Sequence, residues 1–184
     1  MDMTGEQLIP LPQQQVWEAL NDPAILKACI PGCESIEKIS DTEYKVAMTA
    51  AVGPVKARFS GKLLLSDLDP PRAYSLAFEG SGGAAGFGKG TARVSLEPQG
   101  DGTRLVYKAS ATVGGKLAQV GSRLIDGVAR KMADDFFARF NQTVAPAGAG
   151  AAAAATAARP GIPHWAWILI AAIVIALLLF GWAR

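Results

Sequence analysis

A glycine-rich stretch in the middle of the chain has the spacing of a phosphate-binding loop. Residues 82–91 read GGAAGFGKGT, which from Gly83 onward gives G-x-x-x-x-G-K. A P-loop also needs a Ser or Thr after the lysine to hold Mg²⁺, and a helix whose N-terminus faces the phosphates. Here Gly90 follows the lysine, and GTARVSLEP alternates like a strand. We therefore predict a strand connection that forms a hinge in a cavity wall; a mobile flap at the cavity mouth is the alternative.

Other side chains that could perform catalysis are scarce. The only histidine, His164, lies beside an apolar tail, so a Ser-His-Asp or Cys-His arrangement cannot form in the part before it. Cys29 and Cys33 are spaced C-x-x-x-C, which is neither a redox C-x-x-C motif nor a complete zinc set. We interpret them as two free thiols. The sequence predicts no catalytic residue, no metal site and no enzymatic activity.

The charge balance argues against a polyanionic partner. The chain has 18 Lys and Arg residues and 16 Asp and Glu residues, and Arg159 and Arg184 supply the excess. The part before residue 146 is therefore neutral. Binding to nucleic acid normally needs a basic surplus that releases counterions from phosphates, so we do not expect it here.

The C-terminal segment has the composition of a membrane span. Residues 165–182, WAWILIAAIVIALLLFGW, carry no charge and would form a helix about 27 Å long, enough for the hydrocarbon core of a bilayer. Trp165, Trp167 and Trp182 stand at its ends, where such rings settle at the headgroups. The N-terminus has no apolar run typical of a secretory signal. We predict a single-pass tail anchor in the cytoplasmic (inner) membrane, with the globular part in the cytoplasm.

Two further segments precede this anchor. Residues 145–164 are rich in Ala, Gly and Pro and are predicted to be a flexible linker. Residues 1–144 are predicted to form the folded domain. It begins with a strand at residues 4–11 and two short helices at 12–22 and 24–29, followed by six strands whose apolar residues alternate. A long amphipathic helix over residues 116–144 completes an α+β domain.

The alternation identifies the side chains that should face the helix. We expect some of them to line a ligand cavity between the sheet and the helix. For the three tyrosines among them core packing is the first interpretation, and lining the cavity is the alternative. The predicted cavity residues are Tyr44, Val46, Met48, Phe59, Leu63, Tyr74, Leu76, Phe78, Phe87, Val94, Leu105, Tyr107, Leu117, Val120, Leu124, Val128, Met132 and Phe136.

Several motifs spread over the folded part resemble one known family. They are TGE at 4–6, VWEALNDP at 16–23, CIPGCES at 29–35, VGPVKARFSGKL at 52–63, GFGKGTA at 86–92, GGKLAQVGSRLI at 114–125 and DDFF at 134–137. Together they closely resemble the carbon monoxide dehydrogenase G-subunit family of the START-like (SRPBCC) superfamily. The resemblance implies a helix-grip fold, in which an antiparallel sheet of about seven strands wraps around a long C-terminal helix.

The resemblance also implies a function. It suggests a non-catalytic partner of carbon monoxide dehydrogenase or a related molybdenum hydroxylase, which the tail would recruit to the membrane. The cavity would hold an isoprenoid quinone, menaquinone or ubiquinone, that passes electrons to the respiratory chain. A docking or maturation factor without a ligand is the alternative. A third possibility is an enzyme, like some members of the superfamily, but the predicted domain contains no histidine and no evident buried acid, which disfavours it.

Overall fold

The computed structural model describes residues 1–145, which form one compact unit, Met1–Ala145. The predicted linker beyond Ala145 and the predicted membrane anchor with its three tryptophans lie outside the described residues. Among the helices of residues 1–145, none has both the length and the apolar character needed to cross a membrane.

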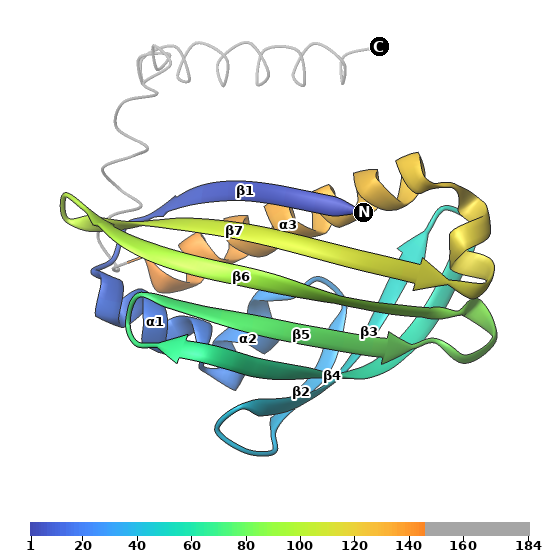
Figure 1. The fold of residues 1–184 in the computed structure, drawn as a ribbon, viewed down its shortest axis with the longest axis horizontal. Coiled ribbons are helices and arrows are strands. Elements are labelled where there is room, and N and C mark those ends of the chain that lie inside the picture. Colours follow the sequence, from blue (N-terminus) through green and yellow to red (C-terminus); the bar gives the residue numbers. More distant parts are fainter. Residues whose placement is uncertain (146–184) are drawn as a thin grey trace, which may run out of the picture. The chain divides into compact units, whose positions relative to one another are not determined.

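Seven antiparallel strands form a single sheet, as the alternation predicts, in the spatial order β1-β7-β6-β5-β4-β3-β2 (Figure 1). The strands are β1 (Asp2–Ile9), β2 (Cys33–Lys38), β3 (Glu43–Val52), β4 (Val55–Asp69), β5 (Ala73–Ser81), β6 (Phe87–Gln99) and β7 (Gly102–Gly114). Strands β2 to β7 follow one another as a meander, and β1 pairs with β7. Burial alternates along β4, so one face of the sheet is covered and the other is exposed to water.

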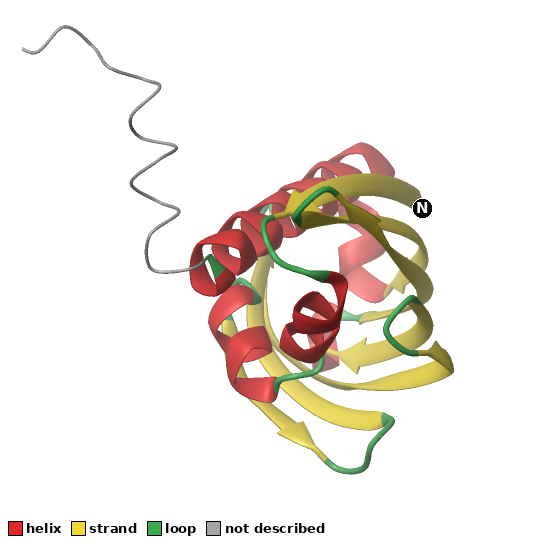
Figure 2. Ribbon diagram, turned by 90° about the vertical axis from the view of Figure 1, so that its left-hand side faces the viewer, coloured by secondary structure: helices red, strands yellow, loops and turns green. Residues whose placement is uncertain are grey.

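Three α-helices and two short 3₁₀ helices complete the chain. They are α1 (Gln13–Leu20), α2 (Pro23–Cys29), η1 (Gly83–Ala85), η2 (Gly115–Val120) and α3 (Ser122–Val144). Figure 2 shows the strands curving around a concave face that the helices close. Helix α2 begins at Pro23, one residue before the predicted start. The Asp22 carboxylate accepts hydrogen bonds from the Ala24 and Ile25 amides at 2.7 and 3.4 Å, and Pro23 occupies the first turn.

The long C-terminal helix is shorter than predicted. Residues 115–120 form η2, and α3 starts only at Ser122. The break lies at Gly121, whose φ of 93° is outside the helical region and favours glycine. Hydrophobic periodicity continues through this glycine, and for this reason the sequence pattern alone suggests one continuous helix.

Sharp bending of the sheet depends on glycines in the central strands. A Cβ atom on Gly61 would overlap the Glu79 carbonyl oxygen on β5, and one on Gly90 would overlap the Ser110 carbonyl oxygen on β7. Neighbouring strands thus approach more closely at these points than a side chain would permit. The bend turns the sheet around α3 and creates space on its concave face.

A solid core fills one end of this space. Side chains from β1, α1, α2, β7 and the C-terminal half of α3 meet there, and Ile9, Val16, Cys29 and Phe140 are completely buried. The buried Thr103 hydroxyl donates a hydrogen bond of 2.7 Å to the Leu11 carbonyl oxygen. This core anchors the α1 end of the domain, and the cavities lie beyond it.

Candidate ligand cavity

Two adjoining cavities lie between the concave face of the sheet and the helices. The first, which we call the tyrosine cavity, has a volume of about 270 Å³. The second, the apolar cavity, has a volume of about 380 Å³ and is partly open to solvent. Ile30 and Leu63 line both. The concave side of the domain is therefore packed solidly at one end and hollow over the rest of its length.

The tyrosine cavity combines an apolar wall with phenol groups. Its lining residues are Leu20, Asn21, Leu26, Ile30, Tyr44, Leu63, Leu65, Tyr74, Leu76, Ala92, Val94, Leu105, Tyr107, Ala133, Phe136 and Phe137. The Tyr44 hydroxyl donates a hydrogen bond of 3.2 Å to the Asn21 carbonyl oxygen, which connects β3 to the end of α1. Tyr44 lies close enough to Tyr74 to raise the pKa of the Tyr74 phenol.

Tyr74 is buried beside Tyr44 in the wall of this cavity. Its ring and that of Trp17 form a T-shaped pair, with centroids 5.5 Å apart and planes at 86°. Burial, followed by the neighbouring Tyr44, raises the pKa of Tyr74 well above its ordinary value. No residue of 1–145 forms a hydrogen bond with the Tyr74 hydroxyl. A neutral donor with no protein partner therefore lines an apolar cavity, where an acceptor on a ligand could reach it.

Tyr107 on β7 lines the side of the cavity that faces α3. Its ring stacks on Phe137 with centroids 5.4 Å apart, and it fills the space above Gly5 on β1, where a Cβ atom would collide with the ring. Partial burial raises the pKa of Tyr107, with Asp134 adding to the effect and Arg130 opposing it. This phenol is consequently also neutral at physiological pH.

The apolar cavity continues the space toward the other end of the domain. Its lining residues are Ile30, Val46, Met48, Ala50, Val52, Phe59, Gly61, Lys62, Leu63, Phe78, Glu79, Gly80, Gly88, Leu117 and Met132. Gly61, Gly80 and Gly88 are cross-strand neighbours on β4, β5 and β6. Because these three positions have no side chain, they leave the wall of the cavity flat and give it room for a flexible apolar chain.

Most of the predicted cavity residues line one of the two cavities, but four do not. Phe87 lies on the outer face of β6 and is 45% exposed, because its odd position shares the parity of Lys89. Leu124 is 41% exposed in the first turn of α3, beside Gly53. Val120 and Val128 are half-buried but line neither cavity. Val120 lies in η2, before the break at Gly121, so the helical spacing that linked it to α3 does not apply. Leu124 and Val128 lie in the N-terminal half of α3, and the α3 residues that line the cavities begin at Met132.

Sequence reasoning also missed lining residues. Leu20, Asn21, Leu26 and Ile30 come from the α1–α2 segment, and Ala133 and Phe137 lie one position from the predicted stripe on α3. The apolar spacing of α1 and α2 was visible in the sequence. Which side of the sheet these helices cover depends on tertiary packing, and the sequence carried no signal for it.

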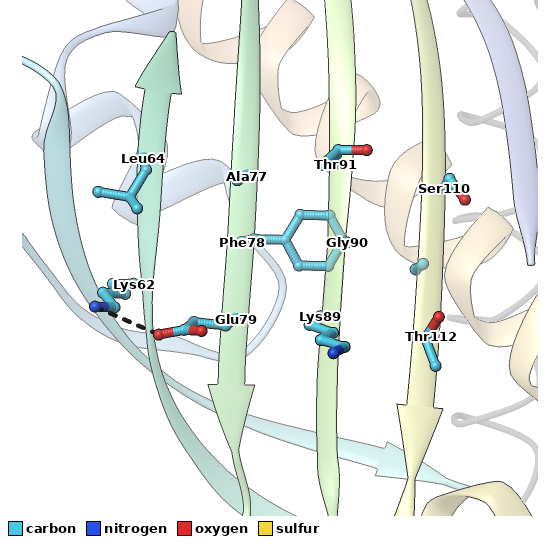
Figure 3. Close-up of a pocket in the computed structure, with 11 residues that line it drawn as sticks. Lys62, Leu64, Ala77, Phe78, Glu79, Lys89, Gly90, Thr91, Ser110 and Thr112 are labelled. Carbon is cyan, nitrogen blue, oxygen red and sulfur yellow. Dashed lines mark ion pairs between the residues drawn. The ribbon is translucent and has the colours of Figure 1, made fainter.

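A third hollow lies on the outer face of the sheet. This outer groove has a volume of about 450 Å³ and crosses β4 to β7 (Figure 3). Lys62 and Glu79 form an ion pair of 3.4 Å at one side of it, and the Phe78 ring covers Gly90. Charged side chains of β4, β5 and β6 and hydroxyl side chains of β6 and β7 line this groove together with a few apolar ones. An apolar ligand would remain in contact with water here, so the groove is better suited to a protein surface.

The glycine-rich stretch forms a strand connection, as its context predicts. It contains η1 and leads directly into strand β6, so the helix that must follow the lysine of a P-loop is not formed. Gly83 and Gly86 have φ values of 58° and 119°, and a Cβ atom on Gly86 would overlap the Gly114 carbonyl oxygen. The glycines permit this turn to pack tightly against the end of β7. Hinge motion of the stretch stays a prediction.

Comparison with known proteins agrees with the fold and the motifs. The family of the carbon monoxide dehydrogenase G subunit (CoxG) matches residues 5–145. The chain belongs to this family. The resemblance seen in the sequence is thereby confirmed, and CoxG proteins are accessory subunits associated with carbon monoxide dehydrogenase. No curated protein gives a significant match.

Solved structures show the same helix-grip fold. A conserved protein from Geobacillus kaustophilus is 34% identical, with a TM-score of 0.74, and the match covers 79% of this CoxG chain and 95% of that one. A protein from Chromobacterium violaceum has a TM-score of 0.60 at 16% identity, covering 79% and 97%. One from Mycobacterium smegmatis has a TM-score of 0.59 at 16% identity, covering 78% and 90%. The last two are informative about the fold alone.

Proposed function

We propose that this CoxG protein is a non-catalytic, tail-anchored carrier that holds an isoprenoid quinone for a molybdenum-containing carbon monoxide dehydrogenase. The observation that carries the proposal is the pair of adjoining cavities, one with an unpaired phenol and one almost entirely apolar. A quinone has the same two parts, a ring with carbonyl acceptors and a long apolar chain. Family membership supplies the enzyme as partner.

The volume of the two cavities and the free energy of burying an isoprenoid chain both suit a quinone. Together the cavities fall within the roughly 300–1,000 Å³ typical of small-molecule sites. Burial of one five-carbon isoprene unit is favourable by about 4 kcal/mol, at about 0.8 kcal/mol per carbon. Each unit buried in the cavity would therefore regain about the free energy that the same unit loses on leaving the bilayer. The predicted tail anchor would keep the domain close to that source.

We assign the ring to the tyrosine cavity and the chain to the apolar cavity. Tyr74 would donate to a quinone carbonyl oxygen, while Val46, Met48 and Phe59 would contact the chain. The partly open apolar cavity then provides the exit for the end of the chain. The domain itself would perform no chemistry on the quinone, and the enzyme would deliver the electrons.

Extraction of the purified protein tests the proposal. The full chain in detergent and the fragment of residues 1–145 are extracted with organic solvent, and the extracts are analysed by mass spectrometry. We expect co-purified quinone, and saturable uptake of added menaquinone or ubiquinone. Absence of both from folded protein would refute the carrier function.

Ligand-free docking is the second candidate, and the outer groove favours it. Its alternating Lys62, Glu79 and Lys89 present charges suited to a complementary protein surface. In that case, removal of residues 146–184 should move carbon monoxide dehydrogenase from the membrane to the cytosolic fraction. Blocking the tyrosine cavity should then leave electron transfer unchanged, whereas the carrier function requires it to fail.

A further inference from the structure

One end of the domain is built from strand ends and their connections, the 3₁₀ helices η1 and η2, and the first turn of α3. The tip of the β3–β4 hairpin contacts α3, since a Cβ atom on Gly53 would collide with the Leu124 side chain. Close contact between Gly86 and Gly115 joins the η1 connection to η2. We call residues 51–58, 82–89 and 114–124 the loop rim. These segments meet at the right-hand end of the domain in Figure 1.

The apolar cavity lies directly behind the loop rim. Val52 at the hairpin tip and Leu117 in η2 both belong to its lining. Outside the cavity, the rim exposes Phe87 and Leu124. The hairpin and η2 add exposed Pro54 and Ala118. A cavity with an almost entirely apolar lining thus ends at a surface that is itself partly apolar.

Charge on the loop rim has one sign. Its ionisable side chains are Lys56, Arg58, Lys89, Lys116 and Arg123, and its three segments contain no Asp or Glu. Arg58 pairs with Glu34 at 2.7 Å, whereas the other four form no ion pair within residues 1–145. Unpaired basic side chains around exposed apolar ones are the combination that binds the interface of an anionic bilayer.

The opposite end of the domain has the reverse charge. There the α1 end and the β4–β5 and β6–β7 turns carry Glu18, Asp22, Asp67, Asp69, Glu97 and Asp101, with Arg72 and Arg104 as the only cations in residues 18–22, 67–72 and 97–104. An anionic surface would therefore attract the loop rim and repel the α1 end. The charges orient the domain with its apolar cavity toward the lipid.

We propose that the loop rim docks on an anionic lipid bilayer, with Leu124 and Phe87 entering the headgroup region and the apolar cavity facing the acyl chains. This inference rests on the proposed function and adds the surface through which the quinone enters. Chain length permits it. Helix α3 places its C-terminal end about 35 Å from the rim, and residues 146–164 could extend to at most about 65 Å.

Vesicle binding by the fragment of residues 1–145 tests the docking without the tail. This fragment is one compact unit with its own core, and the match to the solved Geobacillus structure covers 95% of that chain. We expect it to sediment with phosphatidylcholine vesicles containing phosphatidylglycerol, to do so less as salt rises, and to bind pure phosphatidylcholine at least tenfold more weakly. Equal binding to both, or none to either, would overturn the proposal.

Two matched pairs of variants locate the surface. The double variant Lys116→Gln, Arg123→Gln should weaken binding about thirtyfold, because each basic side chain near such a surface contributes about 1 kcal/mol. Arg93→Gln, Lys108→Gln removes the same charge from the outer sheet face and should change binding less than threefold. If the sheet-face pair has the larger effect, the loop rim is not the docking surface.

The apolar contribution has its own matched pair. Leu124 and Leu68 are 41% and 43% exposed, at the loop rim and in the β4–β5 region respectively. We expect Leu124→Ser to weaken vesicle binding by about tenfold and Leu68→Ser to leave it unchanged. Equal effects of the two would exclude insertion of the rim. Failure of these vesicle tests with retained quinone would refute the docking alone, whereas vesicle binding without quinone would refute the carrier function.

Discussion

Replacement of Tyr74 by phenylalanine removes one hydroxyl and keeps the ring that packs against Trp17. The hydroxyl has no hydrogen-bond partner in residues 1–145, so its loss should not destabilise the fold. The hydroxyl borders the tyrosine cavity, and within residues 1–145 Asn141 Oδ1 is the only fully buried side-chain polar atom without a partner, so we expect stability to change by less than about 1 kcal/mol. For a domain of this size that corresponds to at most about 3 °C in Tm.

Quinone affinity, in contrast, should fall. A hydrogen bond between neutral groups contributes about 0.5–1.5 kcal/mol, so Tyr74→Phe should weaken binding about two- to tenfold. Tyr44→Phe is the matched control, because its hydroxyl already donates to the Asn21 carbonyl oxygen. That variant should lose about 1 kcal/mol of stability and change affinity by less than twofold.

The assay uses the fragment of residues 1–145, in which Trp17 is the only tryptophan. Its ring lies 5.5 Å from Tyr74 between centroids, so a quinone in the tyrosine cavity should quench its fluorescence. Titration with a short-chain menaquinone gives the affinity, and thermal unfolding gives the stability. If Tyr74→Phe is as destabilised as Tyr44→Phe, the hydroxyl has a structural role. Unchanged affinity in both variants would show that the quinone ring does not occupy this cavity.

Three further predictions concern the cavity wall and its titration. Ala92→Leu should fill part of the tyrosine cavity and weaken quinone uptake at least tenfold in the fluorescence titration, while the unfolding free energy changes by less than about 1.5 kcal/mol; unchanged uptake would contradict the assigned site. Gly61→Ala should lower Tm by about 6 °C or more, since its Cβ atom would overlap the Glu79 carbonyl oxygen, whereas Gly80→Ala, whose nearest neighbour would be at 3.8 Å, should stay within about 2 °C. The pKa of Tyr74 is raised by folding, so the neutral form is favoured in the native state, and urea unfolding should show stability that is fully present below pH 10 and is lost as pH rises above it. Tyr74→Phe should remove part of that loss, and an identical pH profile would contradict the burial argument.

Much of the architecture could be read from local patterns. Alternation along residues 44–65 predicts the strands and the side of each that faces inward, because successive side chains in a strand point to opposite faces. Pro23 separates the two short helices in the sequence, and the strand after Gly90 excludes a P-loop. The chemical identity of the cavity side chains, including Tyr44, Tyr74 and Tyr107, also followed from this parity.

Tertiary structure decided which of the inward side chains enclose space and which fill it. Tyr44, Tyr74 and Tyr107 have the same sequence pattern, yet only packing determines that Tyr44 is paired to Asn21 and that Tyr74 is not. The helix break at Gly121 and the contribution of Ile30 likewise depend on contacts between distant segments. Periodicity records which side of an element is apolar. Whether opposing apolar surfaces meet depends on how strongly the sheet bends, and the bend is set by strand contacts at Gly61 and Gly90 that no local pattern contains.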